Sequence, residues 1–127
     1  MTLTPREVEI LEKVHPDLKR VFEAVSERFP CRILEGMRTE ERQKDLFAQG
    51  KSKTLNSKHL TGRAIDAAPL KYKTVDWDDT KLFAYFSGYV LGVADQMGVN
   101  LRHGADWDRD FDLTDTTFFD WPHFEVL

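Results

Sequence analysis

Two short segments far apart in the chain most constrain its fold. Residues 57–66 read Ser-Lys-His-Leu-Thr-Gly-Arg-Ala-Ile-Asp, and residues 120–123 read Asp-Trp-Pro-His. Together they supply two histidines and two aspartates, enough for three zinc ligands and one free carboxylate. A zinc ion with three protein ligands keeps a position open for water, as catalytic zinc sites do. We therefore expect a fold that brings the two segments together, and a zinc hydrolase is the first hypothesis.

The composition is typical of a globular protein with one domain. The 127 residues are 41% hydrophobic and 31% charged, which allows a single core over residues 1–127. No apolar run approaches the about 20 residues of a membrane-spanning helix, and residues 1–7 lack the pattern of a signal peptide. A single cysteine, Cys31, excludes an internal disulfide and a Cys-rich zinc finger. We expect synthesis in the cytosol without membrane insertion.

The net charge of −4 is unevenly distributed. Residues 1–63 carry 13 Lys and Arg against 10 Asp and Glu, whereas residues 64–127 carry 5 against 12. The acidic residues concentrate between Asp106 and Asp120. Neither half has the basic surface that nucleic-acid binding needs, so nucleic acid is excluded as a partner.

The hydrophobic pattern predicts an α+β fold. Thr4 and Glu7 form a capping box around Pro5, which opens the first helix. Residues 51–57 are small and polar, and we expect them to form a loop. Helices are predicted over residues 5–14, 16–28, 40–49 and 78–97, and strands over residues 31–35, 64–70, 99–103 and 124–127.

The surroundings of Asp66 agree with a role as a metal ligand. It lies in the apolar run 64–68, where a buried carboxylate is costly unless a cation or hydrogen bonds satisfy it. A metal ion would do so, and so would pairing with Arg63 or a backbone amide; the position alone leaves both open. A Thr-Gly pair separates His59 from Asp66 and disfavours a helix, so we expect His59 in a loop that leads into a strand.

Asp120 makes His123 a stronger candidate ligand than a lone histidine would be. His123 stands just before the predicted last strand, where a histidine more often packs than binds a metal. A carboxylate three residues earlier can take a proton from a metal-activated water and pass it to a departing amine. The alternative for Asp120 is a turn residue before Trp121 and Pro122.

These motifs resemble a family of zinc peptidases, the D-Ala-D-Ala carboxypeptidases and L-alanyl-D-glutamate endopeptidases, and within it the short phage endolysins. The resemblance covers most of the chain. It implies a small antiparallel sheet with helices packed on one side, a zinc site at the sheet face, and no separate cell-wall-binding domain. The motifs that carry it are Ser-x-His-x-x-Gly-x-Ala-x-Asp at 57–66, Asp-x-x-His at 120–123, and the segments 36–39, 101–107 and 123–125.

The resemblance assigns roles to individual positions. Arg38 matches an arginine that binds substrate and stabilises developing negative charge, although a surface salt bridge to Glu40 or Glu41 is the alternative. Trp107 and Trp121 flank the site in sequence and are candidates for the walls of a substrate cleft, or simply buried. The zinc ligands are matched by His59, Asp66 and His123, the general base by Asp120, and a hydroxyl near the substrate by Ser57.

The function that follows is hydrolysis of the peptide stem of bacterial peptidoglycan at the L-alanyl-D-glutamate bond. As a phage endolysin, the protein would be a bacteriolytic monomer, made in the host cytoplasm and active on the cell wall after release. A D-Ala-D-Ala carboxypeptidase or dipeptidase is the first alternative, because the ligand motif does not separate these bonds. A non-catalytic zinc-containing binding module is the second, and Asp120 and Arg38 argue against it.

Three further features have competing interpretations. His103 is expected to pack or to make a hydrogen bond behind the site. Glu125 lies two residues after His123, so strand alternation puts both on one face, where Glu125 either orients a ligand or is exposed. An acidic loop resembles the first half of a calcium loop but has Phe and Thr where an EF-hand needs Gly and Glu; a solvated loop is the stronger hypothesis and bound Ca²⁺ the second. Its carboxylates are Asp106, Asp108, Asp110 and Asp112.

Overall fold

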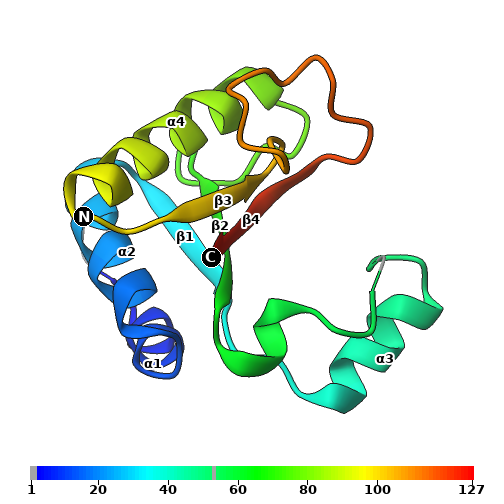
Figure 1. The fold of residues 1–127 in the computed structure, drawn as a ribbon. Helices are drawn as coiled ribbons and strands as arrows, with labels where there is room; N and C mark the ends of the chain where they lie inside the picture. Colours follow the sequence, from blue (N-terminus) through cyan, green and yellow to red (C-terminus); the bar gives the residue numbers. More distant parts are fainter. Residues whose placement is uncertain (1–2, 53) are drawn as a thin grey trace.

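The structure, a computed structural model, describes residues 3–52 and 54–127. Within these residues, no helix is both long and apolar enough to cross a membrane. Figure 1 shows the elements in chain order: α1 (Pro5–Glu12), α2 (Pro16–Arg28), β1 (Cys31–Glu35), α3 (Glu40–Ala48), the short 3-10 helix η1 (Lys58–Thr61), β2 (Ala64–Pro69), α4 (Thr80–Gln96), β3 (Leu101–Gly104) and β4 (Asp120–Val126).

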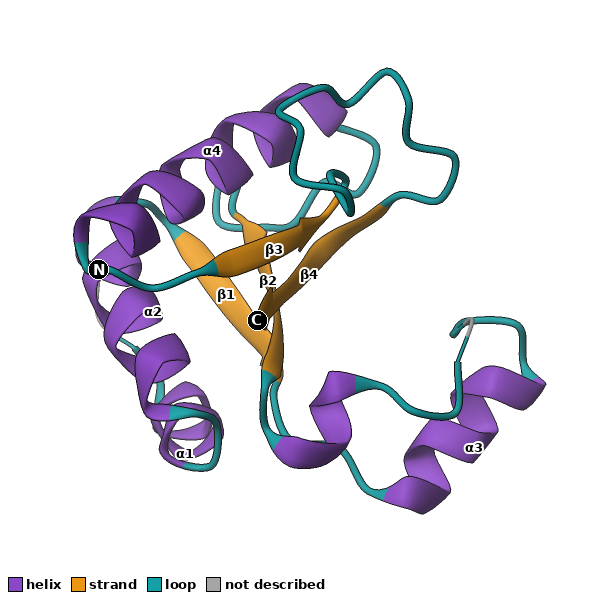
Figure 2. Ribbon diagram, viewed as in Figure 1, coloured by secondary structure: helices purple, strands orange, loops and turns teal. Residues whose placement is uncertain are grey.

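The four strands form one antiparallel sheet in the order β1-β2-β4-β3. Helices α1, α2 and α4 pack on one face of this sheet, and α3 stands apart from it (Figure 2). This arrangement confirms the expected α+β class with helices on one side.

Strand alternation separates a core face from a polar face. On β2, Ile65 and Ala67 are fully buried against the helices, and Asp66 between them points the other way. On β4, Phe124 packs against Phe22 of α2, so His123 lies on the same face as Asp66. The sheet therefore directs its apolar residues to the core and its ionisable residues to the opposite face.

One strand boundary differs from the sequence prediction. β4 begins at Asp120 and not at residue 124, so Asp120 and His123 lie within the strand. Pro122 lacks a backbone N–H, so it cannot donate a hydrogen bond to a neighbouring strand at this position. The strand tolerates it because the β3–β4 register is irregular at this point: His103 pairs with Phe124 but Gly104 pairs with Asp120.

The segment before β2 is more ordered than the predicted loop. Residues 58–61 form η1, and Ser57 caps it by accepting a hydrogen bond from the His59 amide at 3.2 Å. Gly62 ends the turn with φ of 71°, and a Cβ there would lie 3.1 Å from the Lys13 carbonyl oxygen. This turn sets the direction of the His59 side chain. Lys53, in the predicted loop over 51–57, lies outside the described residues.

Glu7 joins the first helix to the edge of the sheet. Its Oε1 accepts from the Thr4 amide at 3.0 Å, which completes the predicted capping box. Its Oε2 accepts from the Ile33 amide at 2.8 Å. Because β1 is an edge strand, this N–H has no neighbouring strand to bond to, and Glu7 satisfies it inside the protein.

We predict that Glu7→Ala lowers the free energy of unfolding by about 2–4 kcal/mol, because it removes a helix cap and leaves a buried N–H unpaired. Thr4→Ala, which removes only the cap, should cost about 1 kcal/mol. Urea unfolding followed by circular dichroism measures both. Equal losses for the two variants would show that the Ile33 contact contributes nothing.

Candidate active site

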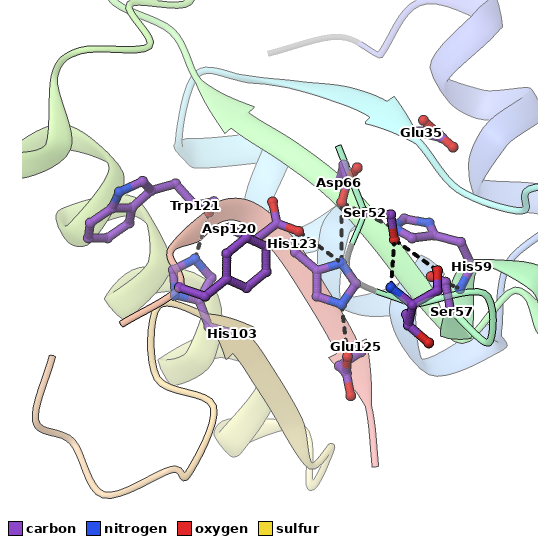
Figure 3. A network of polar contacts seen from close by, with 12 residues as sticks. Glu35, Ser52, Ser57, His59, Asp66, His103, Asp120, Trp121, His123 and Glu125 are labelled. Carbon is purple, nitrogen blue, oxygen red and sulfur yellow. Dashed lines mark hydrogen bonds and ion pairs between the residues drawn. The ribbon is translucent and has the colours of Figure 1, made fainter. Parts of the chain in front are cut away.

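The two central strands and η1 bring together three of the predicted site residues. Asp66 on β2 and His123 on β4 are direct cross-strand partners, so their side chains lie next to each other on one face. Asp66 Oδ1 lies 3.5 Å from His123 Nδ1 and 3.1 Å from Nε2 of His59 in η1. One ligand atom from each residue lies within 4.8 Å of the others. These three residues can therefore hold a metal ion together (Figure 3).

Each imidazole is held in place through its other ring nitrogen. His59 Nδ1 lies 2.7 Å from the Gly36 carbonyl oxygen, to which it donates, and this leaves the lone pair on Nε2. His123 Nε2 lies 2.8 Å from Glu125 Oε1, which leaves the lone pair on Nδ1. Histidine ligands in metal sites are oriented in this way by carbonyl and carboxylate partners. Two imidazoles and one carboxylate also match the ligand types of zinc.

Glu125 is the buried carboxylate that orients His123. It also accepts from Arg102 Nη2 at 2.7 Å and pairs with Lys58 Nζ at 3.3 Å. Burial alone would raise the pKa of Glu125, but the hydrogen bonds to His123 and Arg102 outweigh it and lower the pKa to about 2. Glu125 is thus ionised at neutral pH, and of its two interpretations the orienting role agrees with the structure.

The charges around Asp66 keep its carboxyl ionised. Burial opposes ionisation, but hydrogen bonds to His123 and His59 hold the pKa of Asp66 well below its usual range. Burial likewise opposes protonation of His123, yet hydrogen bonds to Asp66 and Glu125 raise the pKa of this imidazole to about 9. The site therefore favours positive charge, as a cation-binding site must.

Asp120 lies beside the three ligands without joining them. Its Oδ2 is 3.9 Å from His123 Nδ1, and burial together with the Asp66 carboxylate raises the pKa of Asp120. The close approach of β3 fixes its backbone: a Cβ on Gly104 would lie 2.1 Å from the Asp120 carbonyl oxygen. Asp120 is thus a carboxylate near the metal-binding group with a pKa shifted toward neutral pH.

Arg38 faces the site and does not form the alternative surface salt bridge. Its Nε donates to Glu35, its Nη1 donates to Gln43 Oε1 at 2.7 Å, and its Nη2 lies 3.8 Å from Asp66 Oδ2. Glu40 and Glu41 sit in the exposed first turn of α3, which Thr39 caps. Two edges of the guanidinium are thus fixed by the protein, and the third is directed at the site.

A cleft of about 700 Å³ opens over these residues, and Arg38, Ser57 and Trp107 are among the residues that line it. The Trp107 ring lies 5.5 Å from the His123 ring, and its Nε1–H donates to the Phe118 carbonyl oxygen at 2.8 Å. Trp107 therefore forms part of the cleft wall.

Trp121 does not line the cleft, which corrects the expectation that it would form a wall. Its ring packs between Phe83 and Phe119. Its carbonyl oxygen accepts from His103 Nε2 at 2.6 Å, and His103 lies on the core face next to Phe124. Burial lowers the pKa of His103 to about 4, so this histidine packs as a neutral residue. Figure 3 shows Trp121 beyond His103, away from His59.

The acidic loop bonds to its own backbone. Asp106 accepts from the amides of Asp110 and Phe111 at 3.3 and 3.0 Å, and Asp110 accepts from the amide of Asp112 at 2.9 Å. The four predicted calcium ligands do not lie in one cluster. One cluster of carboxylates consists of Asp106, Asp108 and Asp110, and a second consists of Asp110, Asp112 and Asp115. These contacts favour the solvated loop, and nothing supports Ca²⁺ binding.

Several residues that line the cleft or position the site side chains were not predicted from the sequence. Arg102 alternates with core residues on β3 and so faces the cleft, a signal that strand periodicity contained. Gln43 and Lys58 had no such signal, because their positions depend on how α3 and η1 fold back over the sheet. The missed residues that line the cleft or brace it are Glu35, Gln43, Lys51, Lys58 and Arg102.

Comparison with known proteins gives a consistent result. Residues 1–127 match the family model described as phage L-alanyl-D-glutamate peptidase. The L-alanyl-D-glutamate peptidase of Escherichia phage T5 is 32% identical over 125 residues, which cover 92% of this chain and 91% of that protein. A Listeria phage peptidase of the same name is 34% identical over 98 residues, 73% of this chain and 29% of that longer protein. The L-Ala D-Glu endopeptidase of Serratia marcescens has a similar structure, with a TM-score of 0.80, 31% identity, and coverage of 100% of this chain and 90% of that one.

We predict that Glu125→Gln weakens zinc binding about 10- to 100-fold, because the amide keeps the shape but loses the charge that orients His123. Competition with a chromophoric chelator measures the affinity. Glu23→Gln, an exposed change on α2, is the control and should bind zinc as the wild type does. Wild-type affinity in the Glu125 variant would contradict its orienting role.

Proposed function

The chain belongs to the phage L-alanyl-D-glutamate peptidase family. We propose that it is a zinc-dependent endopeptidase that hydrolyses the L-alanyl-D-glutamate bond in the peptide stem of bacterial peptidoglycan. The observation that carries the proposal is the convergence of His59, Asp66 and His123, whose ligand atoms lie within 4.8 Å of one another, next to a carboxylate outside the group. Three ligands leave a coordination position open, as catalysis requires.

The three ligand residues would hold the zinc. Bound there, zinc supplies Lewis-acid chemistry, polarising a carbonyl group and making water more acidic. Gly36 and Glu125 keep the two imidazoles in the required tautomers. The ligand set has a charge of −1, so the loaded site keeps a net charge of +1.

Asp120 is the proposed general base. Its raised pKa brings it closer to the working pH, where a carboxylate can both accept and return a proton. It would take a proton from the attacking water and give it to the amino group of the departing D-glutamyl residue. A binding module would have no use for such a group, which argues against the non-catalytic alternative.

Arg38 is the proposed partner of the negative charge that develops on the scissile carbonyl oxygen. Glu35 and Gln43 fix its Nε and Nη1, so Nη2 faces the cleft without having to reorganise. Its guanidinium stays charged at every working pH. The arrangement orients and stabilises the reacting carbonyl group.

Ser57 and Trp107 are the proposed substrate contacts on either side of the reacting carbonyl group. The Ser57 oxygen accepts from the His59 amide, so its O–H is available to donate to a substrate carbonyl. Trp107 offers an aromatic surface to the stem peptide. We further propose that the enzyme acts as a monomer on the cell wall after release from the host cytoplasm.

We predict that Asp120→Asn lowers kcat by about 10²–10⁴-fold while zinc content and the unfolding temperature stay unchanged, because general acid–base catalysis contributes that much. Asp112→Asn, an exposed change outside the cleft, should keep full activity. Turbidity loss of purified cell walls measures the rate. Wild-type lysis by the Asp120 variant would show that the assigned base is wrong.

A digest of purified peptidoglycan identifies the bond. We expect mass spectrometry to find glycan fragments that end in L-alanine and peptides with a new amino-terminal D-glutamate, and a chelator to abolish both products. Release of free D-alanine would instead favour the carboxypeptidase alternative. No hydrolysis with zinc present would favour the binding module.

A further inference from the structure

We propose that Lys51 binds the free carboxylate of the D-glutamyl residue on the leaving side of the scissile bond. The inference rests on the proposed function and extends it to substrate selection. Lys51 is exposed and lines the active-site cleft. Among the residues that the structure describes, its ammonium group has no ion-pair or hydrogen-bond partner.

The two walls of the cleft differ in charge. The loop between β3 and β4 supplies one wall, which includes Asp108, Asp115 and Trp107. The segment from α3 to η1 supplies the other, which includes Lys51 and Lys58. Figure 1 shows these segments on opposite sides of β4. A substrate carboxylate is therefore attracted to the α3–η1 wall and repelled by the other.

The other cations that line the cleft within the described part of the chain, Arg38, Lys58 and Arg102, are already bound to protein groups. Arg102 and Lys58 both pair with Glu125, at 2.7 and 3.3 Å, and Lys58 also donates to the Val126 carbonyl oxygen at 2.8 Å. Arg38 pairs with Glu35 and serves the reacting carbonyl group in the proposed mechanism. Among the described residues that line this cleft, Lys51 is the cation that remains available for a second negative group on the substrate.

The backbone of Lys51 is held at a defined place. Its amide donates to the Leu46 carbonyl oxygen at 2.9 Å, in the turn that Gly50 makes with φ of 73° at the end of α3. The next residue, Ser52, accepts from Gln43 Nε2 at 2.8 Å. The lysine stem thus starts from an anchored position while its side chain is exposed.

Gln43 connects this anchor to the catalytic arginine. Its Oε1 accepts from Arg38 and its Nε2 donates to Ser52, so one buried side chain fixes both cationic positions on the same wall. Arg38 would meet the scissile carbonyl, and Lys51 would meet a negative group farther along the leaving residue. This places one positive group on each side of the scissile bond.

The leaving residue has the matching chemistry. A glutamyl residue has two carboxyl groups, and the peptide continues through one of them at most, so one carboxylate remains free. A D-alanyl residue inside a peptide has no such group. The terminal D-alanine released from a D-Ala-D-Ala bond does have a free carboxylate, so a cation at Lys51 would select a leaving residue with a free carboxylate over one without it.

The test compares two synthetic muramyl peptides that differ at one group. One has a free carboxylate on the D-glutamyl residue, and in the other that carboxylate is a carboxamide. With zinc-loaded enzyme, Lys51→Gln should raise KM for the carboxylate peptide about 5- to 10-fold with kcat unchanged. It should leave KM for the carboxamide peptide unchanged, and Lys51→Arg should restore low KM. The wild-type preference for the carboxylate should weaken with added salt.

Lys44→Gln is the matched control, because Lys44 is exposed on α3, the helix before Lys51, but does not line the cleft; its KM should equal that of the wild type. An unchanged KM in Lys51→Gln, or an equal rise for both peptides, would overturn the role of Lys51 while the proposed function stands. If the wild type cleaves neither peptide, the proposed function fails and this inference fails with it.

Discussion

The pairing of β2 with β4 at the centre of the sheet is the constraint on which the site depends. It sets Asp66 opposite His123, so that a segment near residue 60 and one near residue 120 supply ligands to one point. A slip of one residue would turn Asp66 or His123 into the apolar core. The large residues on the core face, Ile65 and Phe124, prevent that slip because their burial against the helices holds the register.

The groups around Asp66 and His123 mainly fix how the side chains of the site are oriented. Gly36 and Glu125 each take one ring nitrogen of a histidine, and Glu125 is in turn held by Arg102. Asp120 is kept at its distance by the contact between its backbone and Gly104. A buried charged group without a partner at any of these positions would cost free energy. Each charged group here has a partner of opposite charge or a hydrogen bond. The protein's own side chains and backbone therefore hold the site residues in their orientations.

The sequence predicted the helices and the strand alternation, because those follow from periodicity and capping residues, and its short motifs pointed to three residues that the structure brings together. It failed where tertiary contacts decide. The last strand was predicted to begin at residue 124, but it begins at Asp120, and an irregular register accommodates Pro122. Trp121 was expected beside the substrate because it adjoins the site in sequence, but its ring packs with Phe83 and Phe119. The partners of Arg38 come from the fold of α3, which no local pattern specifies.

The central claim is that two imidazoles and one carboxylate hold zinc with a coordination position left open. X-ray absorption at the zinc edge of the purified, zinc-loaded protein measures this directly. The account predicts two imidazole nitrogens and two oxygens, from Asp66 and water, all at about 2.0–2.2 Å. A sulfur ligand at about 2.3 Å, or fewer than two imidazoles, would contradict it.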